Sequence, residues 1–138
     1  MRKVKFTNEY NLDIVLTDKD AVKLFQYLVN ATGHLRVEEE VGKPEFFYED
    51  TGKPMKVGTA YVSETFSTTD FWDESNGREI ADRYGIKDIG KRYYFTEEEY
   101  NQLKAELEAN PYWKKLDESD GCCGDNIYID LLTANEWI

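Results

Sequence analysis

The chain has 138 residues, and its hydrophobic fraction of 41% includes seven Phe, ten Tyr and three Trp residues. This is enough apolar surface for a folded core, so the composition excludes an intrinsically disordered chain and predicts one domain spanning residues 1–138. With 28 acids against 17 lysines and arginines, the net charge of −11 argues against direct binding to nucleic acid or to anionic membranes.

The first forty residues predict a β-hairpin followed by a helix and a third strand. Residues 2–6 and 12–16 alternate or run apolar, and a polar connection separates them. Thr17 is a typical N-cap for a helix that Gly33 would end. One face of this helix is apolar, through Val22, Leu24, Phe25, Leu28 and Val29. Residues 34–41 alternate again and predict a strand.

The middle of the chain predicts two strands joined by a tight turn, in a meander with their neighbours. The strands are residues 45–50 and 55–66, and the turn contains Gly52 and Pro54. Residues 67–77 are polar and predict a loop. A short helix over 78–85, ending at Gly85, and a short strand over 91–95 follow.

The strongest local signal predicts a helix after Thr96. Thr96 and Glu99 form a capping box, and Phe95 and Tyr100 stand at the two positions of a hydrophobic staple. The helix must end before Pro111. A last strand is expected over residues 126–132. The elements together predict an α+β fold, with an antiparallel-rich sheet and two main helices packed on it.

The chain's only two cysteines, Cys122 and Cys123, are adjacent in a glycine-rich and acidic stretch. Adjacent Cα atoms lie about 3.8 Å apart, which is too close for an unstrained disulfide. The spacing fits none of the common zinc motifs, so we expect a turn leading into the last strand, and neither a metal nor a cofactor. No signal peptide or membrane span is evident. We expect reduced thiols in a soluble, cytoplasmic protein.

Catalytic motifs are weak. The stretch "GIKDIGKR" at 85–92 comes close to a phosphate-binding loop, but Arg92 replaces the required hydroxyl and a strand follows instead of a helix. His34 is the single histidine, and no nucleophile, base and orienting group can be assembled around it. We therefore expect a protein that is not an enzyme, with an enzyme of unrecognised site as the third hypothesis.

The acids offer a different kind of site. Alternate residues on one strand face lie ~6.6 Å apart, about twice the rise per phosphate of a DNA strand, so rows of carboxylates can imitate phosphates. The alternative is a solvated surface without a binding role. The candidate partner-binding acids are Glu38, Glu40, Glu45, Glu49, Asp70, Asp73, Glu74, Asp117, Glu118, Asp120 and Asp125.

Trp72 completes this candidate surface because it lies between Asp70 and Asp73. A large ring beside acids is a suitable anchor for a basic, partly apolar partner site. The other interpretation is structural, with Phe71 and Trp72 closing one end of the core.

This composition resembles that of nucleic-acid mimics carried by phages and mobile elements, which inhibit restriction or CRISPR enzymes. The resemblance involves no shared motif, so no residue role is carried over. It implies an acidic binding protein that occupies a basic, nucleic-acid-binding groove on another protein. The second hypothesis is an interaction or regulatory module that uses an apolar or aromatic surface. The sequence leaves the oligomeric state open.

Overall fold

The structure is a computed structural model, and it describes residues 1–10, 12–30, 42–66, 71–74, 76–115 and 123–137. The fold is α+β with antiparallel strands, as predicted. The strands form two three-stranded sheets instead of one. No helix in the described ranges is long and apolar enough to cross a membrane.

The chain divides into two compact units. Unit 1 consists of Met1–Gly58, Tyr94–Glu97 and Leu131–Ile138, and unit 2 consists of Thr59–Tyr93 and Glu98–Asp130. The expectation of one domain over residues 1–138 stays a prediction. Each unit is described in turn.

The sheet of unit 1 has the order β2-β1-β3. In β1 (Lys3–Thr7), Phe6 pairs with Ile14 of β2 (Asp13–Thr17) and with Phe46 of β3 (Glu45–Tyr48). Both pairings are antiparallel, so the predicted hairpin is confirmed. The short polar connection between β1 and β2 favours this arrangement, since antiparallel neighbours need only a tight loop.

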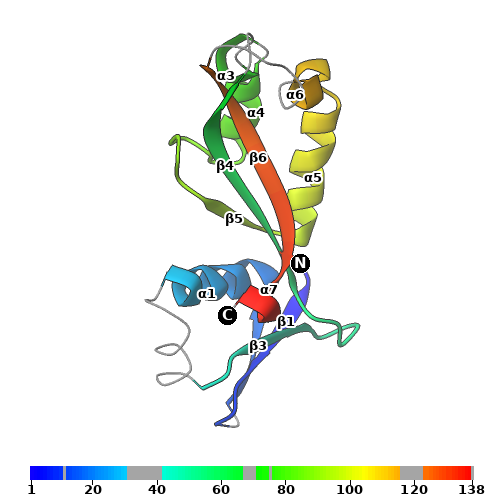
Figure 1. Cartoon of the computed structure of the whole chain (residues 1–138). Helices are drawn as coiled ribbons and strands as arrows, with labels where there is room; N and C mark the ends of the chain where they lie inside the picture. Colours follow the sequence, from blue (N-terminus) through cyan, green and yellow to red (C-terminus); the bar gives the residue numbers. More distant parts are fainter. Residues whose placement is uncertain (11, 31–41, 67–70, 75, 116–122, 138) are drawn as a thin grey trace. The chain divides into compact units, whose positions relative to one another are not determined.

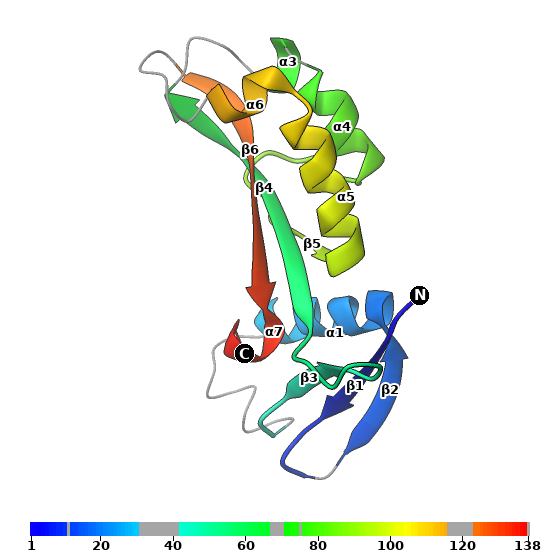
Figure 2. The same ribbon diagram turned by 90° about the vertical axis from the view of Figure 1, so that its right-hand side faces the viewer.

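Helix α1 (Asp18–Asn30) covers one face of this sheet (Figure 2). The Thr17 hydroxyl accepts a hydrogen bond from the Asp20 N–H at 3.2 Å, which confirms the predicted N-cap. The buried face contains Val22, Phe25 and Leu28, as the 3.6-residue period requires. The predicted stop at Gly33 and strand at 34–41 lie outside the described residues.

Aromatic rings fill the centre of unit 1. Phe46 is fully buried and lies 5.1 Å from Phe6 and 6.4 Å from Phe25, measured between ring centroids. Tyr94 packs edge-on against Phe25 at 5.9 Å. Fully burying a phenylalanine side chain contributes roughly 1.5–3 kcal/mol, so this cluster is a main source of stability for the unit.

The outer edge of β3 is closed by two other segments. The Tyr48 N–H donates to the Lys53 carbonyl at 2.8 Å across a turn in which Gly52 has a φ of 70°. The Asn135 side chain accepts from the Phe46 N–H at 2.6 Å and donates to the Phe46 carbonyl at 3.1 Å. The predicted meander is therefore corrected. After this turn the chain enters β4 of the other sheet, so β3 and β4 do not extend one ladder.

Replacing Asn135 with Ala should weaken unit 1 because a buried backbone N–H loses its acceptor. We expect a loss of about 1–3 kcal/mol in unfolding free energy, measured by urea denaturation. Amide hydrogen exchange should accelerate most at Phe46. The control Lys23→Ala, at an exposed position of α1, should stay within about 0.5 kcal/mol. Equal stability of N135A and K23A would show that this contact contributes nothing.

The second sheet has the order β5-β4-β6 (Figure 1). Its strands are β4 (Lys56–Phe66), β5 (Tyr93–Thr96) and β6 (Cys123–Thr133), which match the predicted strands to within about three residues at each end. Tyr61 and Tyr128 stack across β4 and β6 with 5.4 Å between ring centroids. Cross-strand aromatic pairs of this kind stabilise a sheet and fix its register.

The helices of unit 2 lie along one face of β4 and β6 (Figure 2). They are α3 (Phe71–Glu74), α4 (Gly77–Arg83), α5 (Glu97–Glu108) and α6 (Pro111–Lys115), while α7 (Ala134–Trp137) belongs to unit 1. The helix after Thr96 begins as predicted and buries Tyr100, Leu103 and Leu107. Gly85 has a φ of 74° and ends α4, also as predicted. The expected loop at 67–77 is corrected, because α3 lies within it.

Gly77, the first residue of α4, is required by close packing. A Cβ atom there would lie 2.4 Å from the Phe71 ring and 2.6 Å from the Phe71 carbonyl oxygen. We therefore expect Gly77→Ala to destabilise the protein by about 1–3 kcal/mol, even though alanine is the better helix former. The control is Glu79→Ala at an exposed position of α4. Thermal unfolding of the two variants tests this, and a stabilised G77A would contradict it.

Candidate functional site

Among the residues that the structure describes, the predicted acids of unit 1 do not form a continuous anionic row. Glu45 and Glu49 lie on the outer face of the sheet, where the half-buried Phe47 separates them. In the neighbouring strand, Lys5 is directly paired with Phe47, and the Lys3 carbonyl accepts a hydrogen bond from the Glu49 N–H at 3.0 Å. This face therefore alternates in charge. Glu38 and Glu40 lie outside the described residues.

The predicted acids of unit 2 lie in or beside its secondary structure. Asp73 and Glu74 are residues of α3, and Asp125 is a half-buried residue of β6, which begins at Cys123. Asp125 is therefore in a strand and not in the turn that the sequence predicted. The remaining predicted acids of unit 2 lie outside the described residues, namely Asp70, Asp117, Glu118 and Asp120.

Pairing of β4 with β6 brings the end of one strand and the beginning of the other together at one end of unit 2. The strands are antiparallel neighbours, so β4 ends where β6 begins, and α3 and α6 lie at that same end (Figure 1). The Trp113 indole N–H of α6 donates to the Ile127 carbonyl of β6 at 2.9 Å, which ties the helix to the strand. We call residues 64–77 and 111–126 the acidic segments. Their sequences contain eight acids and, as the only bases, Lys114 and Lys115.

Net charge is divided unequally between the units. The sequence of unit 1 contains 12 acids and nine bases, whereas that of unit 2 contains 16 acids and eight bases. Their net charges are therefore −3 and −8. The acidic segments account for −6 of the charge of unit 2. The excess negative charge of the chain is thus concentrated in these segments.

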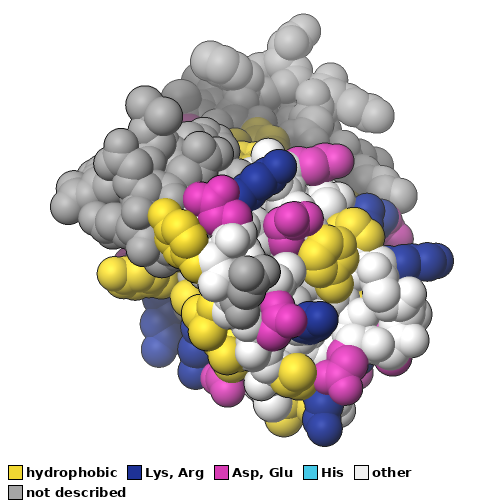
Figure 3. Space-filling model, turned by 90° about the horizontal axis from the view of Figure 1, so that it is seen from below, with side chains coloured by type: hydrophobic (Ala, Val, Ile, Leu, Met, Phe, Trp, Pro, Cys, Tyr) yellow, Lys and Arg dark blue, Asp and Glu magenta, His cyan; other side chains and the backbone are white. Residues whose placement is uncertain are grey.

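Elsewhere on unit 2, two acids of α5 have cationic neighbours. Arg83 of α4 forms an ion pair with Glu106 of α5, and Lys104 lies 3.9 Å from Glu108 one helical turn away. On unit 1, basic, acidic and hydrophobic side chains are likewise interspersed on the face seen in Figure 3. These surfaces resemble ordinary solvated protein surface.

Trp72 occupies a structural position. Its side chain is only 3% exposed, and the neighbouring Phe71 is fully buried. The Arg78 guanidinium lies 5.6 Å from the Trp72 ring centroid. The burial favours the structural interpretation of Trp72 over its interpretation as a partner anchor.

The residues that the structure describes contain no group of three or more His, Cys, Asp or Glu side chains placed to hold a metal ion. Cys123 begins β6, while Cys122 lies outside the described ranges. The predicted turn therefore ends at or before Cys123.

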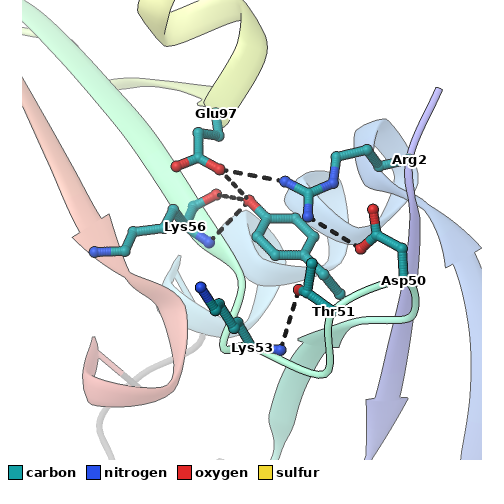
Figure 4. A network of polar contacts seen from close by, with 7 residues as sticks. Arg2, Asp50, Thr51, Lys53, Lys56 and Glu97 are labelled. Carbon is teal, nitrogen blue, oxygen red and sulfur yellow. Dashed lines mark hydrogen bonds and ion pairs between the residues drawn. The ribbon is translucent and has the colours of Figure 1, made fainter.

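A pocket of about 540 Å³ in unit 1 was not predicted from the sequence. One of its lining residues is Tyr48, which is 4% exposed. The Tyr48 hydroxyl accepts a hydrogen bond from the Lys56 N–H at 3.1 Å and lies 3.2 Å from Glu97 Oε1, to which it can donate. Arg2 and Lys53 are further lining residues (Figure 4), as is Glu136.

Arg2 closes one side of this pocket. Its guanidinium lies 3.5 Å from the Tyr48 ring centroid and binds Asp50 at 3.0 Å and Glu97 at 3.4 Å. The hydrogen bond to Asp50 raises the pKa of Arg2, and the same bond holds the pKa of the Asp50 carboxyl below its usual range. Because both carboxylates are close to Arg2, much of its charge is already balanced.

Burial of the Tyr48 phenol raises its pKa to about 12. The hydroxyl therefore remains protonated near neutral pH and serves as a hydrogen-bonding group, not as a general base. Sequence patterns give no sign of this pocket, since its walls come from the chain's start, the turn after β3, the start of α5 and the chain's end.

A scan against protein-family models and searches of curated proteins and of solved structures found no match for the chain.

The late ionisation of Tyr48 can be measured by ultraviolet absorbance of the phenolate after rapid jumps to alkaline pH. Because its folded pKa lies above the usual value of about 10, Tyr48 stabilises the fold fully below that pH, and the contribution is lost as pH rises through about 12. Tyr48→Phe should remove a late step from the titration. Burial also raises the pKa of Tyr84 in unit 2 to about 12. The late titration step of Tyr84 should remain in this variant. Loss of absorbance near pH 10 in Y48F would contradict the assignment.

Proposed function

We propose that this chain is a binding protein whose acidic segments occupy a basic, nucleic-acid-binding groove on another protein and so compete with DNA or RNA. The proposal places it in the cytoplasm, with both cysteines reduced, and assigns it no catalytic role. Its natural setting would be a phage or mobile element, where it would inhibit a defence enzyme.

The observation that supports this proposal most is the adjacency of the end of β4 and the beginning of β6. One acidic segment begins at the end of β4, and the other ends at the beginning of β6. The two segments are far apart in sequence. Glu64, at the end of β4, is exposed, and no described cation lies within ion-pair distance of it. A local excess of charge without counter-charges attracts a cationic groove.

The physical mechanism would be charge complementarity. Carboxylates of the acidic segments would replace phosphates as partners of Lys and Arg in the groove, and electrostatic steering would speed the encounter. Such contacts weaken as salt shortens the screening length, from about 30 Å at 0.01 M to about 8 Å at 0.15 M ionic strength. Binding should therefore be salt-sensitive.

A second candidate function rests on exposed apolar residues of unit 1. Tyr10, Leu12 and Val15, in and before the edge strand β2, are 62%, 49% and 54% exposed. Edge strands with apolar side chains are common contact surfaces. An interaction module that used them would bind with little dependence on salt.

Neutralising the acidic segments should abolish partner binding without unfolding the protein. The test variant combines Asp117→Asn, Glu118→Gln and Asp120→Asn. The matched control makes the same change in net charge in unit 1, with Glu9→Gln, Glu45→Gln and Glu49→Gln. Each immobilised protein is exposed to host lysate, and bound proteins are displaced by salt or duplex DNA. Wild type and control should retain nucleic-acid-binding proteins that DNA displaces. The test variant should retain at least about tenfold less of them, which corresponds to a difference of roughly 1.4 kcal/mol in binding free energy.

Equal losses in the test variant and the control would show that only total charge matters. Retention that persists at high salt, and that DNA does not reduce, would favour the second candidate function. Circular dichroism of all three proteins ensures that the comparison is made between folded chains.

A further inference from the structure

The pocket around Tyr48 contains two lysines whose charges are not balanced by described neighbours. Every lining residue belongs to unit 1, so the pocket is complete within that unit. Unlike Arg2, neither Lys53 nor Lys56 has a carboxylate within ion-pair distance among the described residues.

Tyr48 fixes the backbone of both lysines. Its main-chain N–H donates to the Lys53 carbonyl at 2.8 Å, and its hydroxyl accepts from the Lys56 N–H at 3.1 Å. The Lys53 N–H donates to the Thr51 hydroxyl at 3.3 Å, and Met55, between the lysines, is 1% exposed. Hydrogen bonds therefore hold the backbone from which both lysine side chains extend. Both side chains point away from Asp50 (Figure 4).

The carboxylates of the pocket limit which ligand fits. Glu97 is bound by Arg2 and Tyr48, so its charge is largely compensated. Glu136 is exposed and lines the pocket without a described cationic partner. Its negative charge disfavours a large anion that would extend across the pocket. A polyanion such as DNA would also meet the negative charge of the rest of the chain.

We propose that this pocket binds the anionic group of a small organic molecule, a phosphate or carboxylate held between Lys53 and Lys56. Ammonium groups bind such anions through charge-assisted hydrogen bonds, which are about twice as strong as neutral ones. The pocket, at about 540 Å³, is within the range of small-molecule sites and leaves room for an organic part beside the anion. This site is separate from the acidic segments and stands whether or not they bind a partner.

Inorganic phosphate and acetate are the probes for this site, titrated into isotope-labelled protein and followed by amide NMR shifts. Sodium chloride of equal ionic strength corrects for screening. We expect saturable shifts at residues 51–56, with phosphate binding more tightly than acetate because it carries more charge. Lys53→Gln with Lys56→Gln should weaken phosphate binding by at least about tenfold, since two charge-assisted bonds are lost.

The matched control removes two lysines from the exposed face of α1, by Lys19→Gln and Lys23→Gln. It changes the net charge equally and should leave the phosphate affinity within about twofold of wild type. Shifts at 51–56 no larger than those from chloride, or equal weakening in both double variants, would overturn the proposal. Tighter binding of acetate than phosphate would identify a carboxylate as the ligand group and retain the site.

Discussion

The pairing of β4 with β6 is the interaction on which the rest of this structure depends. It is non-local, since the partner strands Lys56–Phe66 and Cys123–Thr133 are separated by four helices and β5 in the described chain. The stacked rings of Tyr61 and Tyr128 contribute to its register. In unit 2 it places the end of β4 and the beginning of β6, each next to an acidic segment in the sequence, at one end of the sheet. The last residues of β6 lead to Asn135, whose amide closes the edge of β3 in unit 1.

The two units differ in their net charge. Unit 1 is close to charge balance, with lysines beside Glu45 and Glu49 and a pocket lined by three cations and two acids. Unit 2 holds most of the net negative charge, and outside the acidic segments two of its acids, Glu106 and Glu108, are paired with cations. Like charges held together reduce folding stability, so a concentration of acids that persists in a folded domain invites a functional explanation.

Local sequence signals predicted the elements well, because caps, staples and periodicity act over a few residues. Thr17, Gly85 and the Thr96 helix start were all placed correctly. Long-range relations were missed. Nothing in the sequence separates β3 from β4 into different sheets, and nothing shows that Arg2, Tyr48 and Glu97 meet in a pocket. Trp72 was ambiguous for the same reason, since its burial depends on what packs over it.

The most direct test of the central claim is the electrostatic potential near each amide, measured by NMR relaxation with cationic and anionic paramagnetic cosolutes. The account predicts that amides at the end of β4 and the beginning of β6 have the most negative potentials in the protein, with those of β1 and β2 much closer to zero. Potentials equally negative in both places, or least negative beside the acidic segments, would contradict it.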